Sequence, residues 1–199
     1  MFVNKFLSEI KEILEEIDKE AISNLIQVVK EVKDTGGRIF FAGSGGGAGH
    51  SSHAVCDFRK LLSIDCYSLT DNVSELTARI NDDSFENSYS EILKISKPNK
   101  NDCLFIFSVG GGSREQNISP QLCNLIDFGE EIGMKITGIV GRDGGYLATK
   151  SKNVIIIPTV NSNHITPHTE GMQAYLWHLI VTDPQLNPEI TTWESVVEK

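Results

Sequence analysis

Residues 39–47 read IFFAGSGGG and residues 103–113 read CLFIFSVGGGS, so one local pattern occurs twice in the chain. In each case apolar residues typical of a buried strand lead into a loop of serine and glycine. Glycine lets the backbone approach an oxyanion, serine adds a hydroxyl donor, and the free N–H groups of a following helix face the anion. One such loop is as typical of a tight turn as of a ligand site, but two favour a phosphate-binding edge.

Five short apolar runs, rich in Ile, Val and Phe, are separated by segments of helical length. They predict an α/β fold, an open five-stranded parallel sheet with helices on both faces. Right-handed crossovers place the ligand crevice beyond the carboxyl ends of the strands, where both serine/glycine loops fall. The predicted strands are residues 38–42, 64–69, 102–107, 135–140 and 153–158.

The first 33 residues place apolar and charged side chains at helical spacing. They predict one long or two consecutive amphipathic helices that end at Gly36 and Gly37. Such helices can pack on their own domain or on another subunit, and the sequence leaves both open. We expect one domain, with an N-terminal helical element at residues 1–35 and an α/β core at residues 36–199.

Composition excludes several classes of partner. The chain has 27 Asp and Glu against 18 Lys and Arg, a formal charge of -9, and no basic cluster, which argues against nucleic-acid binding. No segment stays apolar long enough to span a membrane, and the N-terminus lacks a signal-peptide pattern. The four cysteines include no C-x-x-C pair, which favours buried thiols in a reducing compartment. We therefore expect a cytoplasmic protein with no membrane or nucleic-acid partner.

A histidine and a carboxylate follow the first loop directly. His53 and Asp57 stand four residues apart, so on a helix they share one face and can reach the same ion or substrate. Taken alone, such a pair is more typical of an exposed hydrogen bond. Its position just after a predicted phosphate loop favours a functional role.

A second polar cluster lies near the C-terminus. Three of the five histidines fall between residues 164 and 178. We expect Thr169 to cap a helix that continues to Val181, which puts Glu170 in the first turn. His178 taken alone is more typical of a histidine that lines a core, since apolar residues surround it.

Together, His53, Asp57, Glu170 and His178 form a mixed nitrogen and oxygen set for a divalent metal such as zinc, or a general acid/base pair without one. On one straight helix, however, Glu170 and His178 are separated by roughly 12 Å of rise. One ion cannot bind both unless the helix begins late. Otherwise the residues serve sites shared between subunits, or the metal has fewer ligands.

These motifs, in this order, resemble the sugar isomerase (SIS) domains of phosphoheptose isomerases. Those enzymes interconvert sedoheptulose 7-phosphate and D-glycero-D-manno-heptose 7-phosphate, and their domain is a flavodoxin-like three-layer sandwich. The resemblance covers nearly the full length, including the N-terminal helices. It rests on residues 43–46 followed by His53 and Asp57, and on residues 81–82, 108–113, 141–145 and 169–178.

The resemblance implies a site for each part of the reaction. Ser108 and Ser113 are the implied phosphate donors, and Asp57 and His178 the implied base and its acid/base partner in an aldose–ketose isomerisation through a cis-enediol. The implied enzyme is a homotetramer with its sites at subunit interfaces. The implied sugar-phosphate contacts are Ser44, Gly45, Gly46, Asn81, Asp82, Ser108, Val109, Gly110 and Ser113. The implied ligands of a divalent metal, zinc, are His53, Asp57, Glu170 and His178.

The chain departs from the family at four places. Ser44 stands where the family has Asn, Asp57 replaces Glu, Glu170 replaces Gln, and residues 108–111 read SVGG in place of STSG. Asp57 withdraws the carboxylate by one methylene, whereas Glu170 adds a negative charge that strengthens a cation site.

Two other functions stay open because of these departures. One is isomerisation of a different sugar phosphate. The other is a non-catalytic module that binds a phosphosugar or, like the replication-initiator-associating relatives of these isomerases, another protein. Retention of His53, His178 and a carboxylate at position 57 favours an enzyme.

Overall fold

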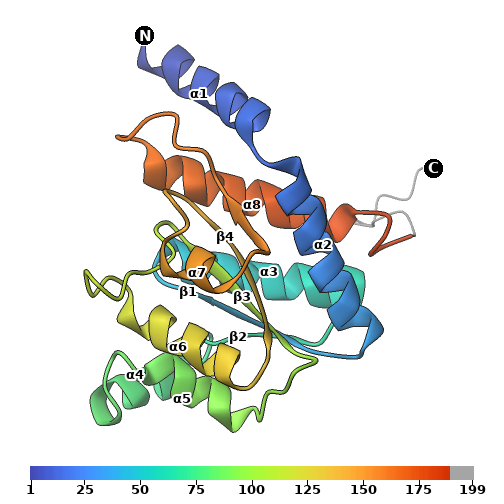
Figure 1. The fold of residues 1–199 in the computed structure, drawn as a ribbon, viewed down its shortest axis with the longest axis vertical. Helices are drawn as coiled ribbons and strands as arrows, with labels where there is room; N and C mark the ends of the chain where they lie inside the picture. The colour runs from blue at the N-terminus through green and yellow to red at the C-terminus, as the bar shows by residue number, and fades with distance from the viewer. Residues whose placement is uncertain (189–199) are drawn as a thin grey trace, which may run out of the picture.

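The computed structural model describes residues 1–188 and contains one five-stranded parallel sheet (Figure 1). The strand order is β2-β1-β3-β4-β5. This confirms the predicted α/β fold, although the outer strands are shorter than the apolar runs that predicted them. The strands are β1 (Ile39–Gly43), β2 (Cys66–Ser68), β3 (Cys103–Ser108), β4 (Lys135–Val140) and β5 (Val154–Ile156).

Helices cover both faces of the sheet, and the alternation of side chains along the strands decides which helix each residue meets. Phe41 and Phe105 point toward a core shared with α2, α3 and α8. Phe40 and Leu104 point toward a second core shared with α5 and α6. The helices are α1 (Phe2–Glu16), α2 (Lys19–Asp34), α3 (Gly46–Leu62), α4 (Val73–Asp82), α5 (Ser88–Ile95), α6 (Pro120–Glu131), α7 (Gly145–Lys150) and α8 (Ile165–Thr182).

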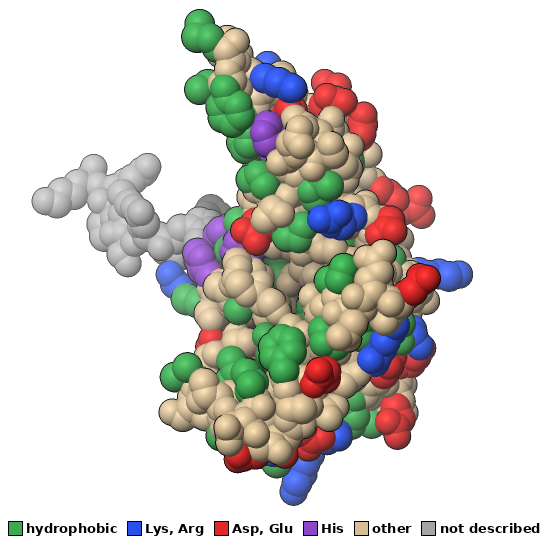
Figure 2. Space-filling model, turned by 90° about the vertical axis from the view of Figure 1, so that its left-hand side faces the viewer, with side chains coloured by type: hydrophobic (Ala, Val, Ile, Leu, Met, Phe, Trp, Pro, Cys, Tyr) green, Lys and Arg blue, Asp and Glu red, His purple; other side chains and the backbone are tan. Residues whose placement is uncertain are grey.

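The N-terminal segment forms two helices. Asp18 separates them and caps α2, since its carboxylate accepts hydrogen bonds from the backbone N–H groups of Glu20 and Ala21. Helix α2 buries six apolar side chains on its own sheet, whereas α1 buries only Glu9 and Ile13. Helix α1 points away from the sheet, and Figure 2 shows apolar side chains exposed at its tip. Helix α2 thus packs on the core of its own domain, whereas α1 is largely uncovered.

Helix α8 begins earlier than the sequence predicted. Its N-cap is His164 and its first residue is Ile165, so Thr169 is a buried residue inside the helix rather than its cap. Pro167 fits the first turn of this helix because its missing N–H costs nothing there, where N–H groups have no intrahelical partner. The expectation of a Thr169 cap was therefore wrong, and Glu170 lies in the second turn.

Three of the four cysteines are buried, and all four are free thiols. Burial raises the pKa of the Cys66 thiol to about 12. Over residues 1–188, every helix is too short or too polar to cross a membrane.

Candidate active site

The two serine/glycine loops meet at the carboxyl edge of the sheet, as the sequence predicted. Strands β1 and β3 are neighbours, with Gly43 opposite Phe107. A methyl group at Gly47 would lie 2.5 Å from the Phe107 carbonyl oxygen, so only glycine permits this approach. The loops line a cavity of about 1300 Å³. The predicted sugar-phosphate contacts that line it are Ser44, Ser108, Val109, Gly110 and Ser113, and the predicted metal ligand Glu170 also lines it.

The first loop is held by two side chains from the far face of the sheet. The Tyr89 hydroxyl donates to the Gly43 carbonyl at 2.8 Å, and Gln121 Nε2 donates to Ser44 Oγ at 2.7 Å. Burial raises the pKa of Tyr89, so its hydroxyl keeps its proton. The sequence did not identify Tyr89 or Gln121, because both come from helices outside the motif. Their hydrogen bonds fix Ser44 at the rim of the cavity.

The second loop is ordered by its own serines. Ser108 Oγ accepts from the Gly111 N–H at 3.0 Å, and Ser113 Oγ accepts from the Gln116 N–H at 3.2 Å. Gly111 has a φ of +69°, which a larger residue rarely adopts. Because the serine oxygens act as acceptors, their hydroxyl protons can be donated to a bound anion.

His53, Asp57 and His178 lie together where α3 packs on α8. The Nε2 atoms of His53 and His178 are 3.6 and 3.5 Å from Asp57 Oδ2, and the Trp177 indole donates to the same oxygen at 2.9 Å. The Asp57 side chain is 7% exposed, against 57% for His53 and 40% for His178. His178 Nδ1 donates to the Ala174 carbonyl at 2.7 Å, so the lone pair of the neutral ring is on Nε2, toward Asp57.

This group fits the divalent metal that the resemblance implies. Its two imidazole nitrogens and one carboxylate oxygen all lie within 4.8 Å of one another, and this donor set is typical of zinc. Glu170 is not part of the group. It lies eight residues before His178, and its carboxylate would be 2.5 Å from a Cβ atom at Gly46. The expected four-ligand set therefore has three members in one chain, with Glu170 at the dipole end of α3 instead.

The group formed by His53, Asp57 and His178 is separate from the cavity, and α8 links the two. None of His53, Asp57 and His178 lines the cavity, whereas Glu170 and Gln173 do. Gln173 is fully buried and donates to the Ser108 and Ile139 carbonyls at 3.1 and 2.8 Å. Its carbonyl oxygen is 2.9 Å from His50 Nδ1, and the His50 ring packs on Trp177. One face of α8 thus joins the serine/glycine loops to Asp57.

Asn81 and Asp82 lie apart from the other predicted contacts. Both are exposed at the end of α4, where Asn81 Nδ2 donates to Asp82 Oδ1 at 2.7 Å. Neither lines the cavity. A single chain therefore does not bring them to the serine/glycine loops.

Arg142 is a residue of the cavity that was not among the predicted site residues. It follows β4, has a φ of +54° and lines the cavity beside Gly110. No ion pair involves Arg142 among residues 1–188, whereas Arg114, the other arginine of the cavity, is paired with Asp127. The motif at residues 141–145 was the signal that could have identified it. Arg142 places a positive charge where an anion would bind.

Comparison with known proteins finds relatives of the kind that the motifs resemble. No protein-family model matches the chain. A phosphoheptose isomerase of Paramagnetospirillum magneticum is 26% identical over 170 residues, which cover 81% of each protein. The chain is thus similar in sequence to phosphoheptose isomerases along most of its length.

Two further proteins extend the comparison. The phosphoheptose isomerase structure from Neisseria gonorrhoeae has a TM-score of 0.76 and 22% identity, and covers 90% of this chain and 95% of that one. It confirms the fold. The lincomycin biosynthesis protein LmbN of Streptomyces lincolnensis is 28% identical over 185 residues, and the match spans 66% of that longer protein.

Proposed function

We propose that this chain is an aldose–ketose isomerase that converts sedoheptulose 7-phosphate to D-glycero-D-manno-heptose 7-phosphate through an enediol. The observation that carries the proposal is the link, through α8, between the serine/glycine loops and the group formed by His53, Asp57 and His178. One end of this arrangement offers hydroxyl and N–H donors for phosphate, and the other offers groups for proton transfer. The names of the relatives supply the substrate.

The length of the site supports a long, open-chain sugar. Glu170 at the cavity and His178 in the histidine group are separated by roughly 12 Å along α8. An extended seven-carbon chain with a terminal phosphate spans roughly 10 Å. With its phosphate held by Ser108 and Ser113, such a substrate is long enough to extend along α8 toward the histidine group.

In the proposed reaction Asp57 removes the proton alpha to the carbonyl, and His178 exchanges a proton with the substrate oxygens. Asp57 then returns its proton to the neighbouring carbon, so the reaction needs no redox partner. The Trp177 indole holds one Asp57 oxygen in place. A zinc ion bound by His53, Asp57 and His178 would occupy the His178 Nε2 lone pair, and would stabilise the charge of the oxyanion in place of proton exchange by His178.

We also propose that the active enzyme is a cytoplasmic homotetramer of single-domain chains, with sites completed at subunit interfaces. The distance of Asn81 and Asp82 from the cavity supports this, because a neighbouring subunit could bring them to a site. The uncovered apolar face of α1 supports it as well. The last eleven positions of the expected domain, residues 189–199, lie outside the described residues.

Assays on C5, C6 and C7 ketose phosphates test the proposed function. We expect turnover of sedoheptulose 7-phosphate to exceed that of the shorter sugars, and a chelator to lower it. If only a shorter sugar phosphate is turned over, that sugar is the substrate instead of sedoheptulose 7-phosphate. If none is turned over, the result favours a non-catalytic binding module. Activity that a chelator leaves unchanged would contradict the metal.

We expect Arg142→Gln to raise KM for the sugar phosphate about tenfold or more, because a hydrogen bond to a charged group contributes about 1.5–3 kcal/mol. The side chain is exposed and unpaired within residues 1–188, so kcat and thermal stability should change little. Steady-state kinetics measure both constants. Lys30→Gln, on the surface of α2, is the control for loss of a positive charge, and an equal KM in both variants would exclude Arg142 from substrate binding.

A further inference from the structure

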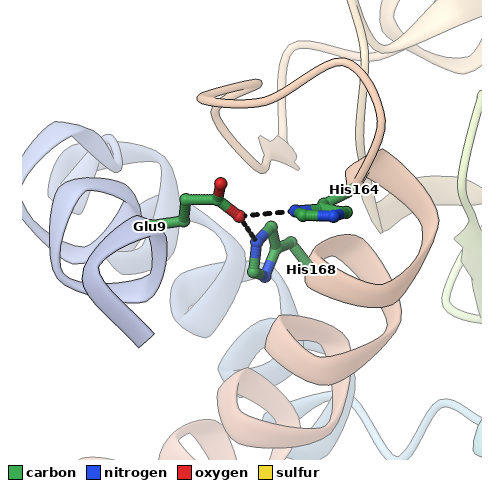
Figure 3. A group of neighbouring side chains, drawn as sticks. All are labelled: Glu9, His164 and His168. Atoms are coloured by element: carbon green, nitrogen blue, oxygen red, sulfur yellow. Dashed lines mark hydrogen bonds and ion pairs between the residues drawn. The ribbon is translucent and has the colours of Figure 1, made fainter. Parts of the chain in front are cut away.

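A second group of side chains suited to bind a metal ion, none of which lines the cavity, lies between α1 and α8 (Figure 3). Glu9 Oε2 is 2.7 Å from His164 Nδ1 and 2.8 Å from His168 Nε2. Glu9 and His168 are each 5% exposed, and the His164 side chain is 19% exposed. A buried carboxylate between two imidazoles is unusual for a surface helix, where Glu normally points to solvent.

The two histidines have the spacing of four residues that places both imidazoles on one face of a metal-binding helix. His164 caps α8 and His168 lies one turn later, so their rings share a face at i and i+4 spacing. The Phe6 ring packs on both imidazoles, with centroids 5.2 Å from His164 and 4.4 Å from His168. This packing fixes the rings and leaves a nitrogen of each directed at Glu9.

Asn161 completes the surroundings of Glu9 and His164. Asn161 Nδ2 donates to Glu9 Oε1 at 2.6 Å and also lies 3.1 Å from His164 Nδ1, while Asn161 Oδ1 accepts from the Asn163 N–H. The amide orientation is thus fixed, and His164 Nδ1 faces a donor and a carboxylate together. Without an ion, His164 Nδ1–H and His168 Nε2–H donate to Glu9 Oε2 while Asn161 donates to Glu9 Oε1. A cation bound by Glu9 Oε2 and the two imidazole nitrogens would take the place of these two imidazole protons.

We propose that Glu9, His164 and His168 bind a second divalent metal ion, Zn²⁺, which fastens α1 to the start of α8. Two imidazole nitrogens and a carboxylate are a common zinc set, with the fourth tetrahedral position left to water. Zinc bonds of about 2.0–2.1 Å place ligand atoms about 3.3 Å apart. The Glu9 contacts must therefore lengthen by only about half an ångström.

The charge of the group also suits a cation. The Glu9 carboxylate is ionised at neutral pH, as is ordinary for a glutamate side chain. Neutral imidazoles and one carboxylate give the group a charge of -1 before an ion binds.

The ion would have a mechanical effect on α1. The buried side chains of this helix are Glu9 and Ile13, so little apolar packing holds it against the rest of the chain. An ion that binds only the docked helix stabilises that arrangement by mass action. The exposed apolar residues of α1 are then presented in one orientation. These exposed residues are Phe2, Val3, Leu7 and Leu14.

Zinc stoichiometry tests the site in the full-length protein. After treatment with a chelator and dialysis, isothermal titration with Zn²⁺ should give two ions per chain. The His53→Ala/His178→Ala variant should keep one ion, which separates this site from the proposed catalytic metal. The His164→Ala/His168→Ala variant should also keep one. Absence of zinc binding in the His53→Ala/His178→Ala variant overturns the proposal.

Hydrogen exchange tests the fastening. In the His53→Ala/His178→Ala background, Zn²⁺ should slow amide exchange at residues 2–16 by tenfold or more, and Glu9→Gln should abolish the slowing. Glu9→Gln keeps the size of the side chain and removes its charge. It therefore tests the site if the His164→Ala/His168→Ala variant fails to fold. Zinc binding without any change in exchange of α1 overturns the proposed fastening.

Discussion

Asp57→Asn is expected to lower kcat for sedoheptulose 7-phosphate by about 10²–10⁴-fold, the usual contribution of a positioned general base. An amide cannot accept the substrate proton, but its oxygen can still accept the hydrogen bond from Trp177. The fold and KM should therefore change little. Steady-state kinetics and thermal unfolding of the purified variant measure these two effects separately.

Three variants complete this experiment. Asp65→Asn makes the same chemical change on the surface and should keep wild-type turnover. Asp57→Glu restores the carboxylate length of the family and should keep activity within about tenfold of wild type, a change of about 1.4 kcal/mol. His178→Ala should lose activity as Asp57→Asn does. If Asp57→Asn and His178→Ala both turn over substrate at the wild-type rate, our assignment of the base and its partner is wrong.

The sheet could be predicted from the sequence because buried parallel strands carry continuous apolar runs. The run at residues 135–140 became β4 without any change of bounds, whereas the run at 64–69 became the three-residue β2. Strand β2 pairs only with β1, so one of its edges has no partner to extend it. Apolar pattern thus predicts where a strand lies better than how long it is.

The site was predicted only in part. The positions of the serine/glycine loops follow from the order of the strands, whereas the position of His53 and Asp57 depends on their distance along α3. The serine/glycine loops follow neighbouring strands, so topology brings them together. His53 and Asp57 follow one of these loops in sequence, but each turn of α3 carries them about 5.4 Å from it. The spacing of four residues on one helix also predicted that Asp57 lies near His53. It could not predict that Glu9 lies beside His168, because that contact depends on how α1 packs.

The opposite edge of the sheet depends on one buried carboxylate. Asp102 is 1% exposed and precedes β3. Its oxygens accept hydrogen bonds from the Arg38 backbone N–H at 2.9 Å, from the Arg38 guanidinium at 2.7 Å and from the Asn99 N–H at 2.9 Å. The group joins the starts of β1 and β3, the two strands that carry the serine/glycine loops at their other ends.

Asp102→Ala is expected to reduce the free energy of unfolding by about 3 kcal/mol, the lower end for breaking a buried ion pair, because Arg38 is 26% exposed and regains some hydration. Urea unfolding measures this loss. Asp65→Ala, which breaks an exposed pair with Arg59, should cost less than about 1 kcal/mol. Equal losses in the two variants would contradict a special role for Asp102.

The pH dependence of Asp102 gives an independent measurement. Burial alone would raise its pKa, but hydrogen bonds from Arg38 and Asn99 outweigh burial and hold the pKa below its ordinary value of 3.8. The unfolded chain therefore takes up this proton first as pH falls. The stabilisation is complete above pH 3.8 and is lost as pH falls through the folded pKa. Wild type and Asp102→Ala should consequently differ most in stability at neutral pH and converge in acid, whereas a constant difference would show that the carboxylate charge does not matter.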